Sequence, residues 1–143
     1  MVTPIIALLL SLGSFVFALL VWTESHRTRR EHHRSVALAS THTAELLLDE
    51  AVTILDRVDG LVRVAGLELG EDAERRYEDY RRTVLADQDK VAKAMIEIAF
   101  GTLSIVECRS IAASSTLITR RTIAGRREVL DVLHRIRAQL AAG

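Results

Sequence analysis

Residues 5–22 read IIALLLSLGSFVFALLVW, a run without a single charged side chain. At about 1.5 Å per residue, a helix over this run extends for roughly 27 Å, close to the hydrocarbon thickness of a bilayer. A secretory signal peptide normally carries Lys or Arg before its apolar run, and the first basic residue here is Arg27. The sequence therefore predicts an uncleaved single-pass transmembrane helix, with an anchor over residues 1–23.

The character of the chain changes after this run, where residues 24–35 form a basic juxtamembrane segment. Basic residues close to one end of a span mark its cytoplasmic side, so we expect the N-terminus outside and the remaining chain in the cytoplasm, at the inner (plasma) membrane. A tryptophan at the end of the run is typical of a membrane interface. The residues expected to contact a bilayer with anionic headgroups are Trp22, Arg27, Arg29, Arg30 and Arg34.

Small residues recur within the apolar run at spacings of three and four. Ala7, Ser11, Ser14 and Ala18 fall on one helical face, where two backbones can approach closely. This pattern predicts self-association in the membrane. The alternative is chance, because small residues are common in membrane helices.

The segment after the anchor contains no helix breaker, so we expect the helix to continue through residues 24–35 into a longer amphipathic helix ending near Leu69. Its apolar stripe is wider than the seam of a two-stranded coiled coil, which favours a helical bundle or a coiled-coil-like hairpin. Gly60 and Gly66 are expected within this helix, away from the stripe. Together with the last helix, the predicted packing stripe comprises Leu47, Leu48, Ile54, Leu55, Val58, Leu61, Val62, Leu133, Ile136 and Leu140.

A helix boundary is predicted at Gly70, because glycine ends helices and the acidic residues that follow favour a new N-terminus. A second helix should start near Asp72. Residues 87–89 interrupt its apolar face and are either a polar waist or another turn. We expect residues 94–106 to form a buried bundle helix with a possible kink at Gly101. A second membrane span is the alternative, which the charges within and around this stretch oppose.

The end of the chain predicts one more turn and one more helix. Residues 119–125 contain two arginines and a glycine, which indicate a turn. The last helix, residues 126–140, is then expected to pack antiparallel against residues 44–62. The acidic stretch 45–59 and the basic end could pair within a protomer or between protomers, or the basic helix could lie on anionic lipid.

The sequence shows no catalytic or metal-binding constellation. Glycine-rich phosphate loops and paired metal-binding helix motifs are absent, and the formal net charge of zero gives no general attraction to nucleic acid. The only cysteine, Cys108, excludes an intramolecular disulfide. Asp131 and His134 offer two ligands where a metal usually needs more. We therefore expect no enzymatic activity, no cofactor and no bound metal.

These observations predict an all-α protein with a cytoplasmic helical bundle over residues 36–143. Its expected function is that of a membrane-anchored, non-enzymatic assembly module that recruits or organises protein partners as an oligomer. The general plan resembles that of many small bacterial or phage membrane proteins, and no motif names a family. One alternative is a holin-like phage lysis protein, which requires residues 94–118 to enter the bilayer. Another is a small ligand-binding or enzymatic bundle that uses Cys108, Asp131 or His134.

Overall fold

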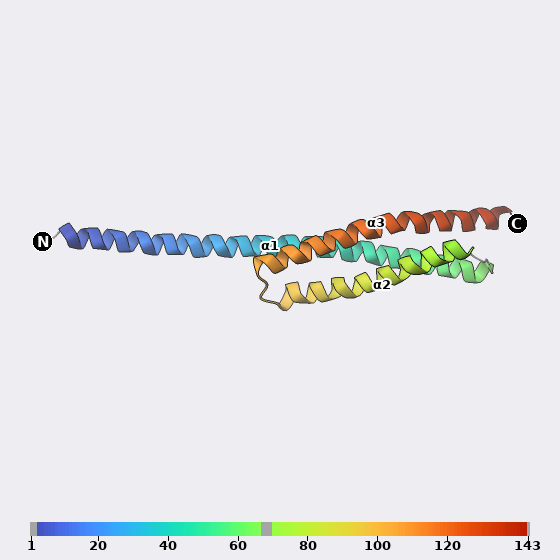
Figure 1. Cartoon of the computed structure of the whole chain (residues 1–143), viewed down its shortest axis with the longest axis horizontal. Helices are drawn as coiled ribbons and strands as arrows, with labels where there is room; N and C mark the ends of the chain where they lie inside the picture. The colour runs from blue at the N-terminus through green and yellow to red at the C-terminus, as the bar shows by residue number, and fades with distance from the viewer. Residues whose placement is uncertain (1–2, 67–69, 143) are drawn as a thin grey trace.

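The computed structural model describes the backbone of residues 3–66 and 70–142, with side chains from residue 13 onward except at 65, 67–69, 142 and 143. It contains three helices: α1 (Thr3–Ala65), α2 (Glu71–Phe100) and α3 (Ile105–Ala142). The described residues form no strand, which confirms the all-α prediction. Figure 1 shows α1 running the length of the molecule, with its N-terminal part extending beyond the other two helices. The predicted continuation of the helix through residues 24–35 is confirmed.

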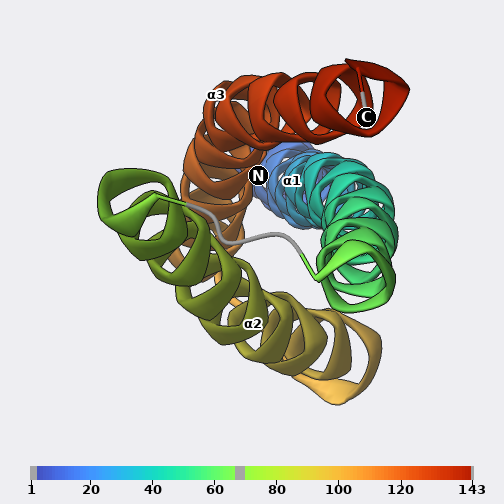
Figure 2. The same ribbon diagram turned by 90° about the vertical axis from the view of Figure 1, so that its right-hand side faces the viewer.

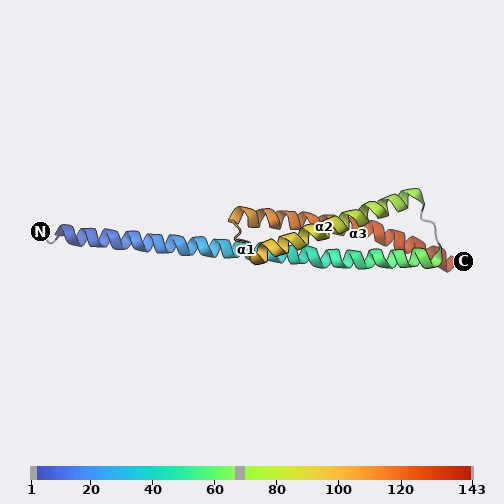
Figure 3. The same cartoon turned by 90° about the horizontal axis from the view of Figure 1, so that it is seen from below.

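The chain reverses direction twice, so α2 runs antiparallel to α1 and α3 runs parallel to it (Figures 1 and 3). Contacts between α1 and α3 confirm that these two helices are parallel. Thr41 contacts Ser115, and Glu50, which comes later in α1, contacts Arg126, which comes later in α3. The prediction that the last helix packs antiparallel on residues 44–62 is therefore wrong. It depended on a third reversal that the chain does not make. Viewed along its length, the molecule is a three-helix bundle (Figure 2).

The first reversal lies close to the predicted boundary. Gly70 is the N-cap of α2, and the first turn of that helix carries Glu71, Asp72 and Glu74, whose charges complement the positive end of the helix dipole. The expectation for Gly66 is wrong, because α1 ends at Ala65 and Gly66 has a φ of 59°, in the left-handed region that terminates helices. Residues 67–69 lie outside the described residues.

The second reversal divides the stretch predicted to be one bundle helix over residues 94–106. α2 ends at Phe100, Gly101 is extended, and α3 begins at Ile105. Ser104 and Glu107 form a reciprocal capping box: the Ser104 amide donates to the Glu107 carboxylate at 2.7 Å, and the Glu107 amide donates to the Ser104 hydroxyl at 3.3 Å. These hydrogen bonds start a new helix, and the one that the carboxylate accepts from the Ser104 amide lowers the pKa of Glu107.

The predicted turn over residues 119–125 is absent, because α3 continues through it. Gly125 lies within the helix, and its missing side chain makes room for the Tyr80 ring of α2, which a Cβ at this position would overlap. The Tyr80 hydroxyl donates to the Thr122 carbonyl at 3.1 Å. Gly125 therefore allows two helices to approach closely and does not start one.

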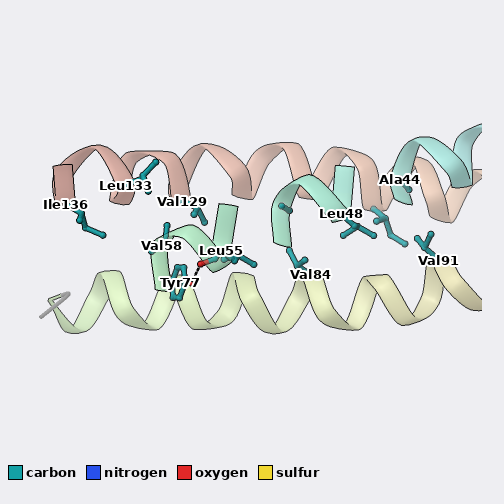
Figure 4. Close-up of a cluster of buried hydrophobic side chains, with 12 residues drawn as sticks. Ala44, Leu48, Leu55, Val58, Tyr77, Val84, Val91, Val129, Leu133 and Ile136 are labelled. Atoms are coloured by element: carbon teal, nitrogen blue, oxygen red, sulfur yellow. Dashed lines mark hydrogen bonds between the residues drawn. The ribbon is translucent and has the colours of Figure 1, made fainter. Parts of the chain in front are cut away.

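The main core lies between the three helices (Figure 4) and includes residues from each of them. Leu48, Leu55, Val58, Leu133 and Ile136 of the predicted stripe are buried, Ile54, Leu61 and Val62 pack against them, and Leu47 is half-buried. The placement of Leu140 in this stripe is wrong, since its side chain is 48% exposed. Paired residues of α1 and α3 differ by 74 to 76 positions, so Leu140 lies level with the end of α1.

In the part of the chain that the structure describes, no helix has the length and apolar character needed to cross a membrane. The predicted span, Ile5–Trp22, includes residues 5–12, whose side chains lie outside the described residues. The same is true of Ala7 and Ser11 in the predicted self-association face. The remaining part, residues 13–22, is helical and its side chains are exposed.

Candidate functional site

Two of the arginines expected at a membrane surface contact the end of α2 and the α2–α3 turn (residues 101–104). Arg34 donates from Nε to the Ile98 carbonyl at 3.0 Å and from Nη2 to the Ala99 carbonyl at 3.0 Å. Arg30 donates from Nη2 to the Leu103 carbonyl at 3.1 Å. The juxtamembrane part of α1 is thus attached to the bundle by hydrogen bonds.

The contacts of Arg34 supply hydrogen-bond donors that the C-terminal end of α2 lacks. The last carbonyls of a helix have no partner within the helix, and they form the negative end of its dipole. The last turn of α2 carries no basic residue, so the guanidinium group that binds its carbonyls is that of Arg34 from α1, while Arg30 binds the turn that follows. This role of Arg34 was not predicted from the sequence. The absence of a basic residue before Gly101 is the signal that could have suggested it.

The remaining residues of the predicted membrane surface are exposed. Trp22 is 65% exposed and stacks on His26 with ring centroids 5.3 Å apart. Arg27 pairs with Glu31 at 3.1 Å. Arg29 is also exposed, and it has no hydrogen bond or ion pair within the described part of the chain.

A cleft of about 390 Å³ separates this part of α1 from the α2–α3 turn. Its wall on α1 runs from Trp22 to Arg34, and its other wall is formed by residues 101–103. The turn and its flanks expose apolar side chains: Phe100 is 87% exposed and Val106 is 76% exposed. The end of the bundle that faces the N-terminal part of α1 is therefore both apolar and rich in arginine.

A polar layer crosses the middle of the bundle and identifies residues 87–89 as a waist within a continuous α2. The buried Asp87 carboxylate accepts hydrogen bonds from Arg121 of α3 and, at 3.2 Å, from Lys90. Six positions before Arg121 on α3, the hydroxyl of Ser115 lies 3.0 Å from that of Thr41. Every fully buried side-chain nitrogen and oxygen in the described residues has a hydrogen-bond partner, so this layer is a satisfied structural element.

The opposite end of the bundle has a shallow groove between α2 and α3, which we call the distal groove. Tyr77, Tyr80, Val129 and Val132 lie in a hollow of about 320 Å³ with charged residues around it. The Tyr77 hydroxyl donates to Asp59 at 2.7 Å and to the Leu55 carbonyl at 2.9 Å. Burial, together with this hydrogen bond to Asp59, raises the pKa of Tyr77, and burial raises the pKa of Tyr80.

The three residues considered for chemistry do not form a common site. Cys108 is buried beside Ala37 and Ile98 near the α2–α3 turn, whereas Asp131 and His134 are exposed far along α3. Among the described residues, no group of three or more His, Cys, Asp and Glu side chains is placed to hold a metal ion. Comparison with known proteins adds no relative, because no family model, curated protein or solved structure matches the chain.

Proposed function

We propose that this chain is a membrane-anchored, non-enzymatic assembly protein. Residues 5–22 hold it in the inner (plasma) membrane, residues 24–35 lie at the cytoplasmic surface, and the bundle recruits or organises protein partners, further copies of the chain among them. The observation that carries the proposal is the extension of α1 beyond the bundle (Figure 1). Along this extension, the large apolar side chains from Phe15 to Trp22 are all at least half exposed.

Leaving this apolar segment in water costs free energy. A helix that is apolar on every side is stable where it is buried or surrounded by lipid, and residues 13–22 are all exposed. Each large apolar side chain transferred out of water contributes about 1.5–3 kcal/mol. The basic residues that follow the segment favour a cytoplasmic bundle, because positive charge is retained on that side.

The bundle supports an interaction role more than a chemical one. Its buried polar groups are satisfied, while the distal groove offers apolar and aromatic surface surrounded by charge. Surfaces of this kind accept an amphipathic helix of a partner. Self-association through the face that includes Ser14 and Ala18 remains part of the proposal. We do not propose the lysis function, because Ile98, Cys108 and Ile118 of the segment it would insert are buried inside the bundle.

The test combines membrane fractionation with a C-terminal reporter that is active only outside the cytosol. The full chain should pellet with membranes and its reporter should stay silent. Phe15→Arg should weaken insertion, because a charge within a span costs about 2.5–3.5 kcal/mol. Leu46→Arg, at an exposed apolar position of the bundle, is the matched control and should leave the membrane fraction unchanged.

Two results would contradict the proposal. Recovery of the wild-type chain outside the membrane fraction would show that residues 5–22 do not anchor it. A strongly active reporter would place the bundle on the opposite side of the membrane.

A further inference from the structure

We infer that the α2–α3 turn is a second membrane contact, in which Phe100 and Val106 enter the headgroup layer of the bilayer that holds α1. This inference rests on the proposed function and deepens it. Such a contact holds the bundle against the lipid surface, whereas the anchor alone would leave the tilt of the bundle relative to that surface unrestrained.

The position of the turn along α1 is the first support. Arg30 contacts Leu103, and the cleft between the turn and α1 extends to Trp22, the last residue of the predicted span. Eight residues separate Trp22 from Arg30, which corresponds to about 12 Å along a helix. The headgroup layer is roughly 5–8 Å deep on each side of the hydrocarbon, so an upright α1 holds the turn about 4–7 Å above that layer, and a tilt of α1 by about 20° toward the turn brings its apolar flanks closer to it.

The chemistry of the turn is the second support. Phe100 and Val106 flank it and are 87% and 76% exposed, although both are apolar. They project from the ends of two helices whose backbones are fixed by Arg34 and by the Ser104 capping box. A rigid turn with apolar side chains on both flanks is suited to insertion, because no additional backbone has to be ordered on contact.

The charges around the turn are the third support. Arg29 has no partner among the described residues, and Arg109 lies on the same end of the bundle, 3.4 Å from His33. Arginine side chains at this height bind phosphate oxygens of anionic lipid. Of the carboxylates at this end, Glu107 accepts from the Ser104 amide and Glu31 pairs with Arg27. The expected ligand is therefore an anionic phospholipid surface.

The test measures the depth of single labels in the full chain, reconstituted in vesicles of phosphatidylcholine and phosphatidylglycerol. In a Cys108→Ala background, a polarity-sensitive fluorophore is attached after Phe100→Cys, Val106→Cys or Val64→Cys. Val64 is the matched control, because it is an apolar residue with 88% exposure near the far end of α1. Lipids carrying a quencher next to the headgroup should quench the first two labels at least twofold more than the third.

The outcomes separate this inference from the proposed function. If the protein floats with the vesicles and all three labels are quenched equally weakly, the anchor stands and the turn does not touch lipid. If the labels at positions 100 and 106 are shielded from water but lipid quenchers do not reach them, a second copy covers the turn and the inference is overturned. If the protein does not float with the vesicles, the anchor fails and the inference fails with it.

Discussion

Replacing Gly125 by alanine tests the closest contact between α2 and α3. Alanine is the better helix former by about 1 kcal/mol, so a substitution in an open part of a helix should stabilise the protein. At Gly125 the new Cβ would overlap the Tyr80 ring. The ring must therefore move, and it loses its hydrogen bond to the Thr122 carbonyl.

The size of the effect follows from these contacts. Loss of the hydrogen bond costs about 0.5–1.5 kcal/mol. Truncating a fully buried large aromatic side chain costs about 3–5 kcal/mol, and displacing the half-buried Tyr80 should cost roughly half of that. After the gain in helix propensity is subtracted from the sum of these two costs, Gly125→Ala should lower the free energy of unfolding by about 1–3 kcal/mol.

Urea unfolding of the full chain in detergent, followed by far-UV circular dichroism, measures this change. Gly60→Ala is the matched control, because Gly60 lies in α1 with nothing within 4 Å of its added Cβ, and it should stabilise the protein. In a Tyr80→Ala background, Gly125→Ala should also become stabilising, by about 1 kcal/mol. Equal stabilisation by Gly125→Ala and Gly60→Ala in the wild-type background would show that Tyr80 does not pack on Gly125.

Two further predictions concern the junction of α1 with α2 and the distal groove. Arg34→Gln should lower the free energy of unfolding by about 1–2 kcal/mol, because two carbonyls of α2 lose a charged donor. Arg29→Gln is the control and should change the free energy of unfolding by less than about 0.5 kcal/mol. Similar urea midpoints for the two variants would contradict the contact of Arg34 with α2. Because the folded pKa of Tyr77 and of Tyr80 is raised, their contribution to stability is complete below the unfolded value of about 10 and is lost as the pH rises above it. Phenolate absorbance should therefore rise together with the loss of helical signal, and phenolate formation in a fully helical protein would contradict the burial.

The elements that the sequence predicted well are those with local signals. The continuous α1 follows from helical spacing without a breaker, and the start of α2 follows from Gly70 and the acidic residues after it. The capping box of Ser104 and Glu107 is also local, and it is the signal that could have located the start of α3. These features need no knowledge of the rest of the fold.

The errors have a shared physical cause, which is that one residue type serves several purposes. Glycine lacks a Cβ, so it can end a helix, as at Gly66, or admit a neighbouring ring, as at Gly125, and only the neighbour decides between them. The turn assigned to residues 119–125 then reversed the direction of the last helix. Arg34 illustrates a second limit, because its acceptors lie 64 and 65 residues away and are backbone carbonyls, which leave no mark in the side-chain sequence.

The unbroken α1 has a mechanical consequence for a protein held at one end. A continuous helix of 63 residues acts as a rigid lever, so the tilt of its N-terminal segment in the membrane is also the tilt of the whole bundle. The distance from Trp22 to Ala65 is about 65 Å along the axis, and at a tilt of about 20° the far end moves sideways by about 22 Å. The α2–α3 turn lies on one side of this lever, so its contact with lipid would select the direction of tilt. The bilayer would thereby determine how far to the side of the anchor the distal groove lies when it meets a partner.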